Sequence, residues 1–345
     1  MAYLVLENGA VFEGQRIGAT GNAVGELVFT TGMVGYLETL TDPAFAGQIV
    51  IQTFPLIGNY GVAPQDAEGR PALYGYVVRE LCDEPSNFRS EGTLDAFLKH
   101  HGIVGLCGVD TRELTRILRE HGTMNAVICD NIPEDPAPLK QYCVYGAVAQ
   151  VSTTKAVIHP TTERRFAVTL IDCGVRSSVI DALCKRGCEV TVVPHDTSAE
   201  VILAAKPDGV VLSGGPGDPA ENTALIATVK ALFGNVPLFG MGLGQQLVAL
   251  ARGGKTSKLK HGHRGANQPV RCDGDRRTYI TSQNHGYAVE SDTLPTTAVI
   301  THYNANDGTC EGIAYTDAPC FTVQFDPDPR DYDRFVALMG GEPNA

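Results

Sequence analysis

The chain has 345 residues, of which 43% are hydrophobic and 19% are charged, a composition typical of a soluble globular protein with two domains. Its formal net charge of −12 argues against binding to nucleic acid or to an anionic membrane, because both carry negative charge. The sequence contains no run of about 18 apolar residues, which is the length needed to span a bilayer. The ten cysteines are scattered and the chain opens without a signal-peptide pattern, so we expect reduced thiols and a cytoplasmic location.

Residues 1–130 combine short alternating apolar patterns, which predict strands, with two amphipathic helical patterns. The opening segment MAYLVLENGAVFEG predicts a hairpin around its Asn-Gly pair. The segments TLDAFLKHHG and DTRELTRILREHG predict helices that begin at capping residues Thr93 and Asp110 and end at glycine. We therefore predict an N-terminal α+β domain over 1–130. A linker over 131–165 follows, because that segment holds four prolines and no sustained period.

From residue 166 onward, continuous apolar segments alternate with amphipathic helical ones. This rhythm predicts a C-terminal α/β domain over 166–345 with a mostly parallel sheet flanked by helices on both faces. The last segments, from YITSQNHGYAVE to CFTVQFDPDP, predict antiparallel strands followed by a short helix. Ligand chemistry in such a domain belongs at the carboxyl ends of the parallel strands.

Two glycine-rich corners follow predicted strands, LSGGPGDPA and FGMGLGQQL. The first matches a dinucleotide fingerprint in spacing but follows the third strand of the domain, and no acidic residue lies about twenty positions further on. Neither corner continues into the Lys-Ser/Thr pair of a phosphate-binding loop. The second corner has the small-x-nucleophile-x-Gly frame of a nucleophile elbow, with Gly242 at the nucleophile position.

The chain resembles the small, glutamine-hydrolysing subunit of carbamoyl phosphate synthetase, a class I glutamine amidotransferase, over nearly its whole length. In the N-terminal domain the resemblance rests on GATGNAVGELVFTTGMVGYLETLTDPAFAGQIV, SNFR and DTRELTRILREHG. In the C-terminal domain it rests on LIDCGVRSS, LSGGPGDP, FGMGLGQQL, GHRGANQPV, SQNHGYAV and VQFDPDP. Together these motifs are highly specific.

The resemblance implies a Cys-His-Glu triad for glutamine hydrolysis, and this sequence departs from the family at all three positions. The triad positions hold Gly242, Asp326 and Asp328. The two backbone donors of the oxyanion hole would be Gly215 and Leu243, whose role does not depend on a side chain. We therefore expect glutaminase activity to be lost, because removing a triad nucleophile costs on the order of a millionfold in rate.

The resemblance also implies a set of glutamine-binding positions. Besides the two oxyanion residues, these positions hold Ala44, Gly217, Gln246, Asn284, Gly286 and Tyr287. At Ala44 the family has a residue with a hydroxyl group, so this contact is lost here.

Other residues are weak substitutes for the triad. Cys173 follows a strand, but its DCGV turn is a structural feature of the family, and His285 is better interpreted as a hydrogen-bonding residue of a loop. Asp326 is a carboxylate, which is a weaker base than imidazole at neutral pH, and it has no thiol to activate. His261 and His263 alternate on a predicted strand and are expected to pack or face solvent. Cys184 and Cys188 lack partner ligands, so we expect no metal site.

These observations predict a synthetase small subunit, acting for pyrimidine and arginine pathways, that lacks glutaminase activity. It would bind the large subunit, which uses ATP, magnesium and bicarbonate, and would itself hold no cofactor. Synthesis would then depend on free ammonia, or the chain would be a structural subunit. Two alternatives remain open: a non-catalytic protein that binds glutamine and reports it to a partner, and an amidohydrolase with a rewired site.

Overall fold

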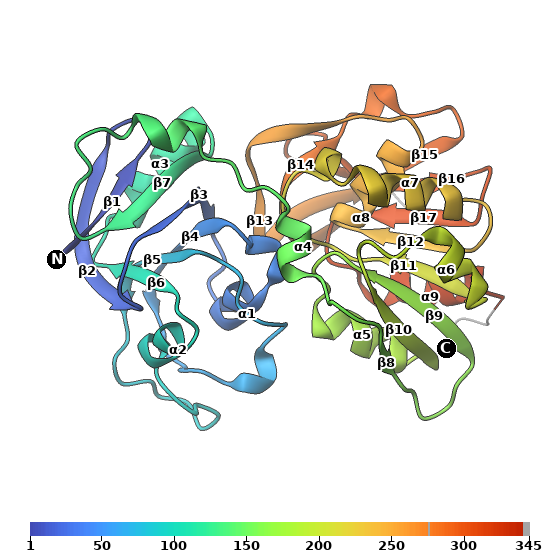
Figure 1. The fold of residues 1–345 in the computed structure, drawn as a ribbon, viewed down its shortest axis with the longest axis horizontal. Helices are drawn as coiled ribbons and strands as arrows, with labels where there is room; N and C mark the ends of the chain where they lie inside the picture. Colours follow the sequence, from blue (N-terminus) through green and yellow to red (C-terminus); the bar gives the residue numbers. More distant parts are fainter. Residues whose placement is uncertain (275–276, 341–345) are drawn as a thin grey trace. The chain divides into compact units, whose positions relative to one another are not determined.

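The computed structural model describes residues 1–274 and 277–340, which form two compact units (Figure 1). The first unit consists of Met1–Ala147 together with six residues from later in the chain, Lys260–Gly265. The second consists of Val148–Leu259 and the residues that follow Gly265. The first unit is therefore assembled from two separate stretches of chain.

Seven strands of the first unit close into a barrel in the order β1-β2-β6-β5-β4-β3-β7. Their bounds are β1 Ala2–Leu6, β2 Val11–Gly18, β3 Ala23–Thr30, β4 Gln48–Ile57, β5 Gly75–Leu81, β6 Val104–Cys107 and β7 Met124–Cys129. The predicted hairpin is confirmed, because β1 and β2 pair antiparallel with Val5 opposite Val11. A closed barrel leaves no unpaired edge strand.

The helices of the first unit are α1 Tyr36–Thr41, α2 Leu94–His100 and α3 Thr111–His121, with 3-10 turns η1 Pro43–Phe45, η2 Pro64–Asp66 and η3 Ala137–Gln141. Two of them, α2 and α3, begin where their capping residues predict, whereas α1 was not predicted and follows Gly35 without a side-chain cap. The Thr93 side chain caps α2 and the Asp110 side chain caps α3. Leu114 and Leu118 of α3 pack into one apolar cluster of the barrel, and α1 and α2 pack into another.

The segment 131–165, predicted to be a linker, contains regular structure besides η3. It includes α4 Ala147–Val151 and β8 Val157–His159. Strand β8 pairs antiparallel with β10, with Ile158 opposite Thr191, and so extends the sheet of the second unit. A three-residue strand is too short to produce a recognisable period in the sequence.

The second unit is built on a ten-stranded sheet in the described part of the chain, with strand order β14-β13-β15-β16-β17-β12-β11-β9-β10-β8. Its further strands are β9 Phe166–Asp172, β10 Cys188–Pro194, β11 Gly209–Leu212, β12 Leu238–Met241, β13 Thr256–Cys272, β14 Thr278–Val289, β15 Ala298–Asn304, β16 Cys310–Tyr315 and β17 Cys320–Val323. The predicted parallel core is confirmed for β10, β9, β11 and β12. Strand β17, predicted to be antiparallel, also joins this core, because it pairs parallel with β12 and antiparallel with β16.

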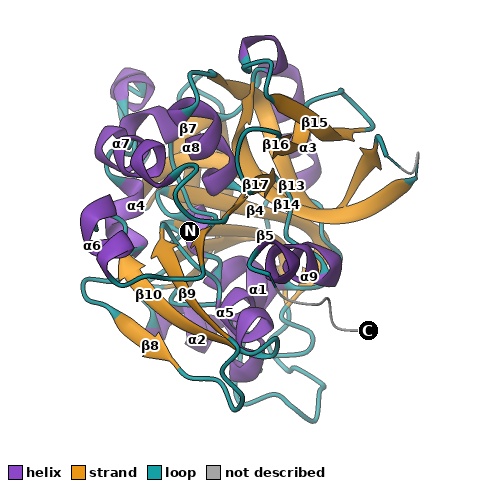
Figure 2. Cartoon of the chain, turned by 90° about the vertical axis from the view of Figure 1, so that its right-hand side faces the viewer, coloured by secondary structure: helices purple, strands orange, loops and turns teal. Residues whose placement is uncertain are grey.

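Helices cover both faces of the parallel core (Figure 2). They are α5 Ser177–Cys184, α6 Ala199–Ala204, α7 Thr223–Leu232, α8 Leu243–Ala251 and α9 Pro329–Leu338, with 3-10 turns η4 Pro219–Glu221 and η5 Ser291–Thr293. Helices α6, α7 and α8 pack on one face, and α5 and α9 pack on the other. Within 1–274 and 277–340, the helices are all too short or too polar to cross a membrane.

Candidate functional site

The corner between β12 and α8 has the backbone shape of a nucleophile elbow, with Gly242 at its apex. Gly242 has φ 54° and ψ −115°, and its N–H donates to the Val323 carbonyl at 2.9 Å. This conformation is unfavourable for residues with a side chain. A Cβ atom added at Gly242 would lie 3.3 Å from the Gly214 Cα and 3.9 Å from the Gln324 carbonyl oxygen. The corner could therefore admit a side chain with a small adjustment, but it presents none.

The glycines on either side of the apex let α8 approach the sheet. A Cβ at Gly240 would lie 2.8 Å from the Gly244 carbonyl oxygen, and a Cβ at Gly244 would lie 2.4 Å from the Leu212 carbonyl oxygen. Real Cβ atoms do not approach oxygen so closely. The spacing of glycines around Gly242 is thus required for packing of the helix, as the elbow frame predicts.

The two predicted oxyanion residues are neighbours at this corner. A Cβ at Gly215 would lie 3.0 Å from Cδ2 of Leu243 and only 2.1 Å from the Cys173 carbonyl oxygen, so Gly215 cannot be replaced without rearrangement. Leu243 is the first residue of α8, where the N–H has no partner within the helix. Gly217 lies in the same turn as Gly215, with φ 85°. The helix N-terminus favours negative charge at this place.

Asp326, which the sequence resemblance places at the position of the triad histidine, forms a two-point ion pair with Arg176. Its carboxylate oxygens accept from the two terminal guanidinium nitrogens at 2.7 and 2.8 Å. Arg176 precedes α5 and Asp326 follows β17, so the pair joins two turns after strands of the parallel core. Both side chains are largely shielded, with 22% and 33% of their surfaces exposed. The negative charge of the Asp326 carboxylate is therefore balanced by the Arg176 guanidinium.

Asp328, which the sequence resemblance places at the position of the triad glutamate, caps α9. Its side chain accepts from the Arg330 N–H at 2.7 Å, and the Asp331 carboxylate accepts in return from the Asp328 N–H at 2.9 Å. Burial raises the pKa of Asp328, but hydrogen bonds from Arg330 outweigh it and leave that pKa below its ordinary value. Asp326 and Asp328 both border a cavity of about 360 Å³. The Asp326 carboxylate is thus held by Arg176, and the Asp328 carboxylate is held at the start of α9.

Most of the predicted glutamine contacts lie in the second unit. Gln246 is buried in α8, and its amide nitrogen donates to the Tyr287 carbonyl at 2.8 Å and to Oε1 of Gln324 at 3.0 Å. Asn284, Gly286 and Tyr287 all lie on β14. Ala44 lies in η1 of the first unit, where its N–H donates to the Asp42 carboxylate.

The residues considered as substitutes for the triad are engaged elsewhere. Cys173 is fully buried, and burial raises the pKa of its thiol well above the ordinary value, so it holds no thiolate at neutral pH. His285 lies on β14 and not in a loop. One of its ring nitrogens contacts the Tyr287 carbonyl at 2.8 Å and the other contacts Oε1 of Gln283 at 3.2 Å.

Burial also raises the pKa of the Cys184 and Cys188 thiols, which disfavours the thiolates a metal would need.

Sequence reasoning missed Arg176 and the role of Asp331. Arg176 is separated from Asp326 by 150 residues, and no local signal connects them. Asp331, in contrast, could have been found, because an acidic residue three positions after Asp328, with proline at the first helical position, is typical of a helix start.

Comparison with known proteins agrees with this geometry. Residues 169–331 match the family model for glutamine amidotransferase class-I, and the elbow and the parallel sheet are consistent with this class. Residues 4–128 match the model for the CPSase domain of the carbamoyl-phosphate synthase small chain, and the chain belongs to this small-chain family.

Three relatives illustrate the similarity. The carbamoyl phosphate synthase small chain of Bacillus caldolyticus is 45% identical over 350 residues, covering 97% of this chain and 96% of that one. A small chain of Listeria monocytogenes (strain F2365) is 46% identical over 353 residues, covering 98% and 97%. A pyrimidine-specific small chain of Halalkalibacterium halodurans is 45% identical over 356 residues, covering 97% and 96%.

Proposed function

We propose that this small subunit does not hydrolyse glutamine, and that its complex with the large synthetase subunit makes carbamoyl phosphate from free ammonia. The observation that carries the proposal is the elbow: its positive-φ backbone turn is kept, while Gly242 places no atom where a nucleophile would attack. Loss of a triad nucleophile lowers the rate by about a millionfold, because binding and oxyanion donors alone give little catalysis.

The surroundings of the elbow support the same proposal. A rewired hydrolase would need a free base, but Arg176 holds the Asp326 carboxylate at two points. It would also need a nucleophile, and the cysteine considered for this role, Cys173, is buried as a neutral thiol. Of the three triad positions, Asp326 forms an ion pair, Asp328 caps a helix, and Gly242 has no side chain.

The test is to purify the chain with its large subunit and to compare synthesis driven by glutamine with synthesis driven by ammonium. We expect ammonium to support carbamoyl phosphate formation, and glutamine to give neither product nor glutamate. The same large subunit paired with a family member that carries the intact triad is the positive control. Glutamine-driven synthesis comparable to the ammonium-driven rate would contradict the proposal.

A second candidate function is glutamine binding without turnover. It is favoured by Gly215, which lies next to Leu243 at the start of α8, and by the buried Gln246. The hydrogen bonds of Gln246 to Tyr287 and Gln324 hold this part of α8 against its neighbours. Titration calorimetry with glutamine distinguishes the two functions: saturable binding without release of ammonia supports the sensor, while absence of binding leaves a structural subunit.

A further inference from the structure

The outer face of α3 in the first unit carries a row of arginines that glutamine chemistry does not use. Arg112, Arg116 and Arg119 are spaced i, i+4 and i+7, so their side chains share one face of the helix. Together with Arg79 of β5 they line a groove of about 1250 Å³ between α3 and strands β4 and β5.

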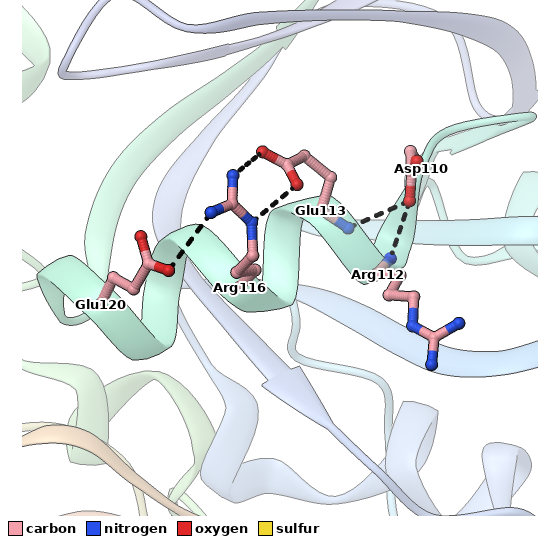
Figure 3. Close-up of polar contacts among 5 residues, drawn as sticks. All are labelled: Asp110, Arg112, Glu113, Arg116 and Glu120. Carbon is pink, nitrogen blue, oxygen red and sulfur yellow. Dashed lines mark hydrogen bonds and ion pairs between the residues drawn. The ribbon is translucent and has the colours of Figure 1, made fainter.

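One of these arginines is held in place by its own helix. The Arg116 guanidinium donates to both carboxylate oxygens of Glu113, at 2.6 and 2.9 Å, and to Glu120 at 3.3 Å (Figure 3). Asp110 accepts from the first N–H groups of the helix, and the Arg112 side chain extends away from this chain of contacts (Figure 3). The hydrogen-bonding groups of Arg116 are thus paired with Glu113 and Glu120, which fixes the position of this arginine in the row.

The other three guanidinium groups are available. Throughout 1–274 and 277–340, the side chains of Arg79, Arg112 and Arg119 make no hydrogen bond or ion pair with another residue, and all three are exposed. Unpaired arginines that converge on one groove present several planar donor forks to the same ligand, and such forks match carboxylates.

The remaining lining residues favour a protein surface over a small anion. Four carboxylates, those of Glu80, Asp110, Glu113 and Glu120, border the same groove and cancel the formal charge of the four arginines. A polyphosphate in the groove would be repelled by these carboxylates. A protein surface can instead place individual carboxylates next to the guanidinium groups and away from the carboxylates of the groove. The volume also exceeds the roughly 300–1,000 Å³ of most small-molecule sites. Arginine is enriched at protein interfaces in general.

We propose that this α3 groove docks a carboxylate-bearing surface of the large synthetase subunit, through Arg79, Arg112 and Arg119. The inference rests on the proposed function only in naming the partner. Docking through these side chains does not depend on the elbow, because the three residues belong to the first unit and the elbow to the second.

The experiment measures binding of the full chain to the purified large subunit by biolayer interferometry at low salt. The variant Arg79→Gln/Arg112→Gln/Arg119→Gln is expected to raise Kd by about tenfold, since each exposed charge pair contributes modestly. The difference should shrink in 0.5 M NaCl, because salt screens such pairs. A matched variant, Arg70→Gln/Lys140→Gln/Lys155→Gln, removes the same charge at exposed positions outside the groove and should leave Kd within about twofold.

Three results would overturn the inference. An unchanged Kd for the groove variant, with melting temperature as for the unmodified chain, would show that the groove faces solvent in the complex. An equal loss in the matched variant would indicate a general charge effect. Saturable binding of ATP to the free chain that the groove variant abolishes would make the groove a small-anion site. Glutamine-driven synthesis, in contrast, would refute the proposed function and leave the docking result unaffected.

Discussion

Gly242 can be tested by giving the elbow a side chain. The variant Gly242→Ala keeps the corner without reactive chemistry, and its cost has two sources. A residue other than glycine at φ 54° and ψ −115° is strained by about 1–3 kcal/mol. The added Cβ lies 3.3 Å from the Gly214 Cα, which adds a small displacement but no severe clash. We therefore expect the free energy of unfolding to fall by about 1–3 kcal/mol.

The assay is urea or thermal unfolding of the purified chain. For a unit of this size the expected loss corresponds to a fall in Tm of about 2–12 °C. Gly214→Ala is the matched control, because Gly214 lies in the neighbouring turn after β11, has no positive φ, and has open space around its added Cβ. Gly242→Ala no less stable than Gly214→Ala would refute the reasoning. Gly242→Cys should show the same loss of stability and still release negligible ammonia from glutamine, since no base accompanies the thiol.

Three further predictions concern the carboxylates of the segment that follows β17 and begins α9. Asp328→Ala should lower the stability of the chain to unfolding by about 1 kcal/mol through loss of the α9 cap, whereas Asp328→Asn should retain most of it; equal losses in urea titrations would contradict this. Burial raises the pKa of Asp331 to about 6, so the folded chain binds a proton more tightly than the unfolded chain, and this contribution to stability is lost as pH rises from about 4 to 6. Asp331→Asn should abolish that dependence in unfolding curves measured across the range. A double-mutant cycle of Arg176→Ala and Asp326→Ala should give a coupling free energy of about 1 kcal/mol, and additive effects would show that the ion pair contributes nothing.

The parts of the fold that depend on local sequence were predictable. The start of α3 at Asp110 and the turn at Gly242 follow from residues within a few positions, because capping and positive φ are local requirements. The alternation of apolar strands and amphipathic helices likewise predicted the parallel core. Each of these signals lies within one helix, strand or turn, so it can be recognised from neighbouring residues in the sequence.

Pairing between distant segments was not predictable. Strand β17 reads as the end of an antiparallel meander, yet Phe321 lies opposite Phe239 of β12 in a parallel pair, and their rings stack at 4.6 Å. The ion pair of Arg176 and Asp326 has the same origin, because both residues reach one edge of the sheet only after it forms. For the candidate site, the sequence therefore predicted which reacting groups were absent but not what their replacements contact.

The six residues Lys260–Gly265 have a consequence for the order in which the chain can fold. The Thr123 N–H donates to the Lys260 carbonyl at 2.8 Å, and the buried Arg264 donates to the His261 carbonyl within the same short stretch. During synthesis this stretch leaves the ribosome only after most of the second unit has been made. All seven strands of the barrel are made before residue 130, but the contacts that Lys260–Gly265 adds to the first unit can form only after this later stretch has been made. The first unit therefore reaches its full set of contacts only when much of the second unit is also available to fold.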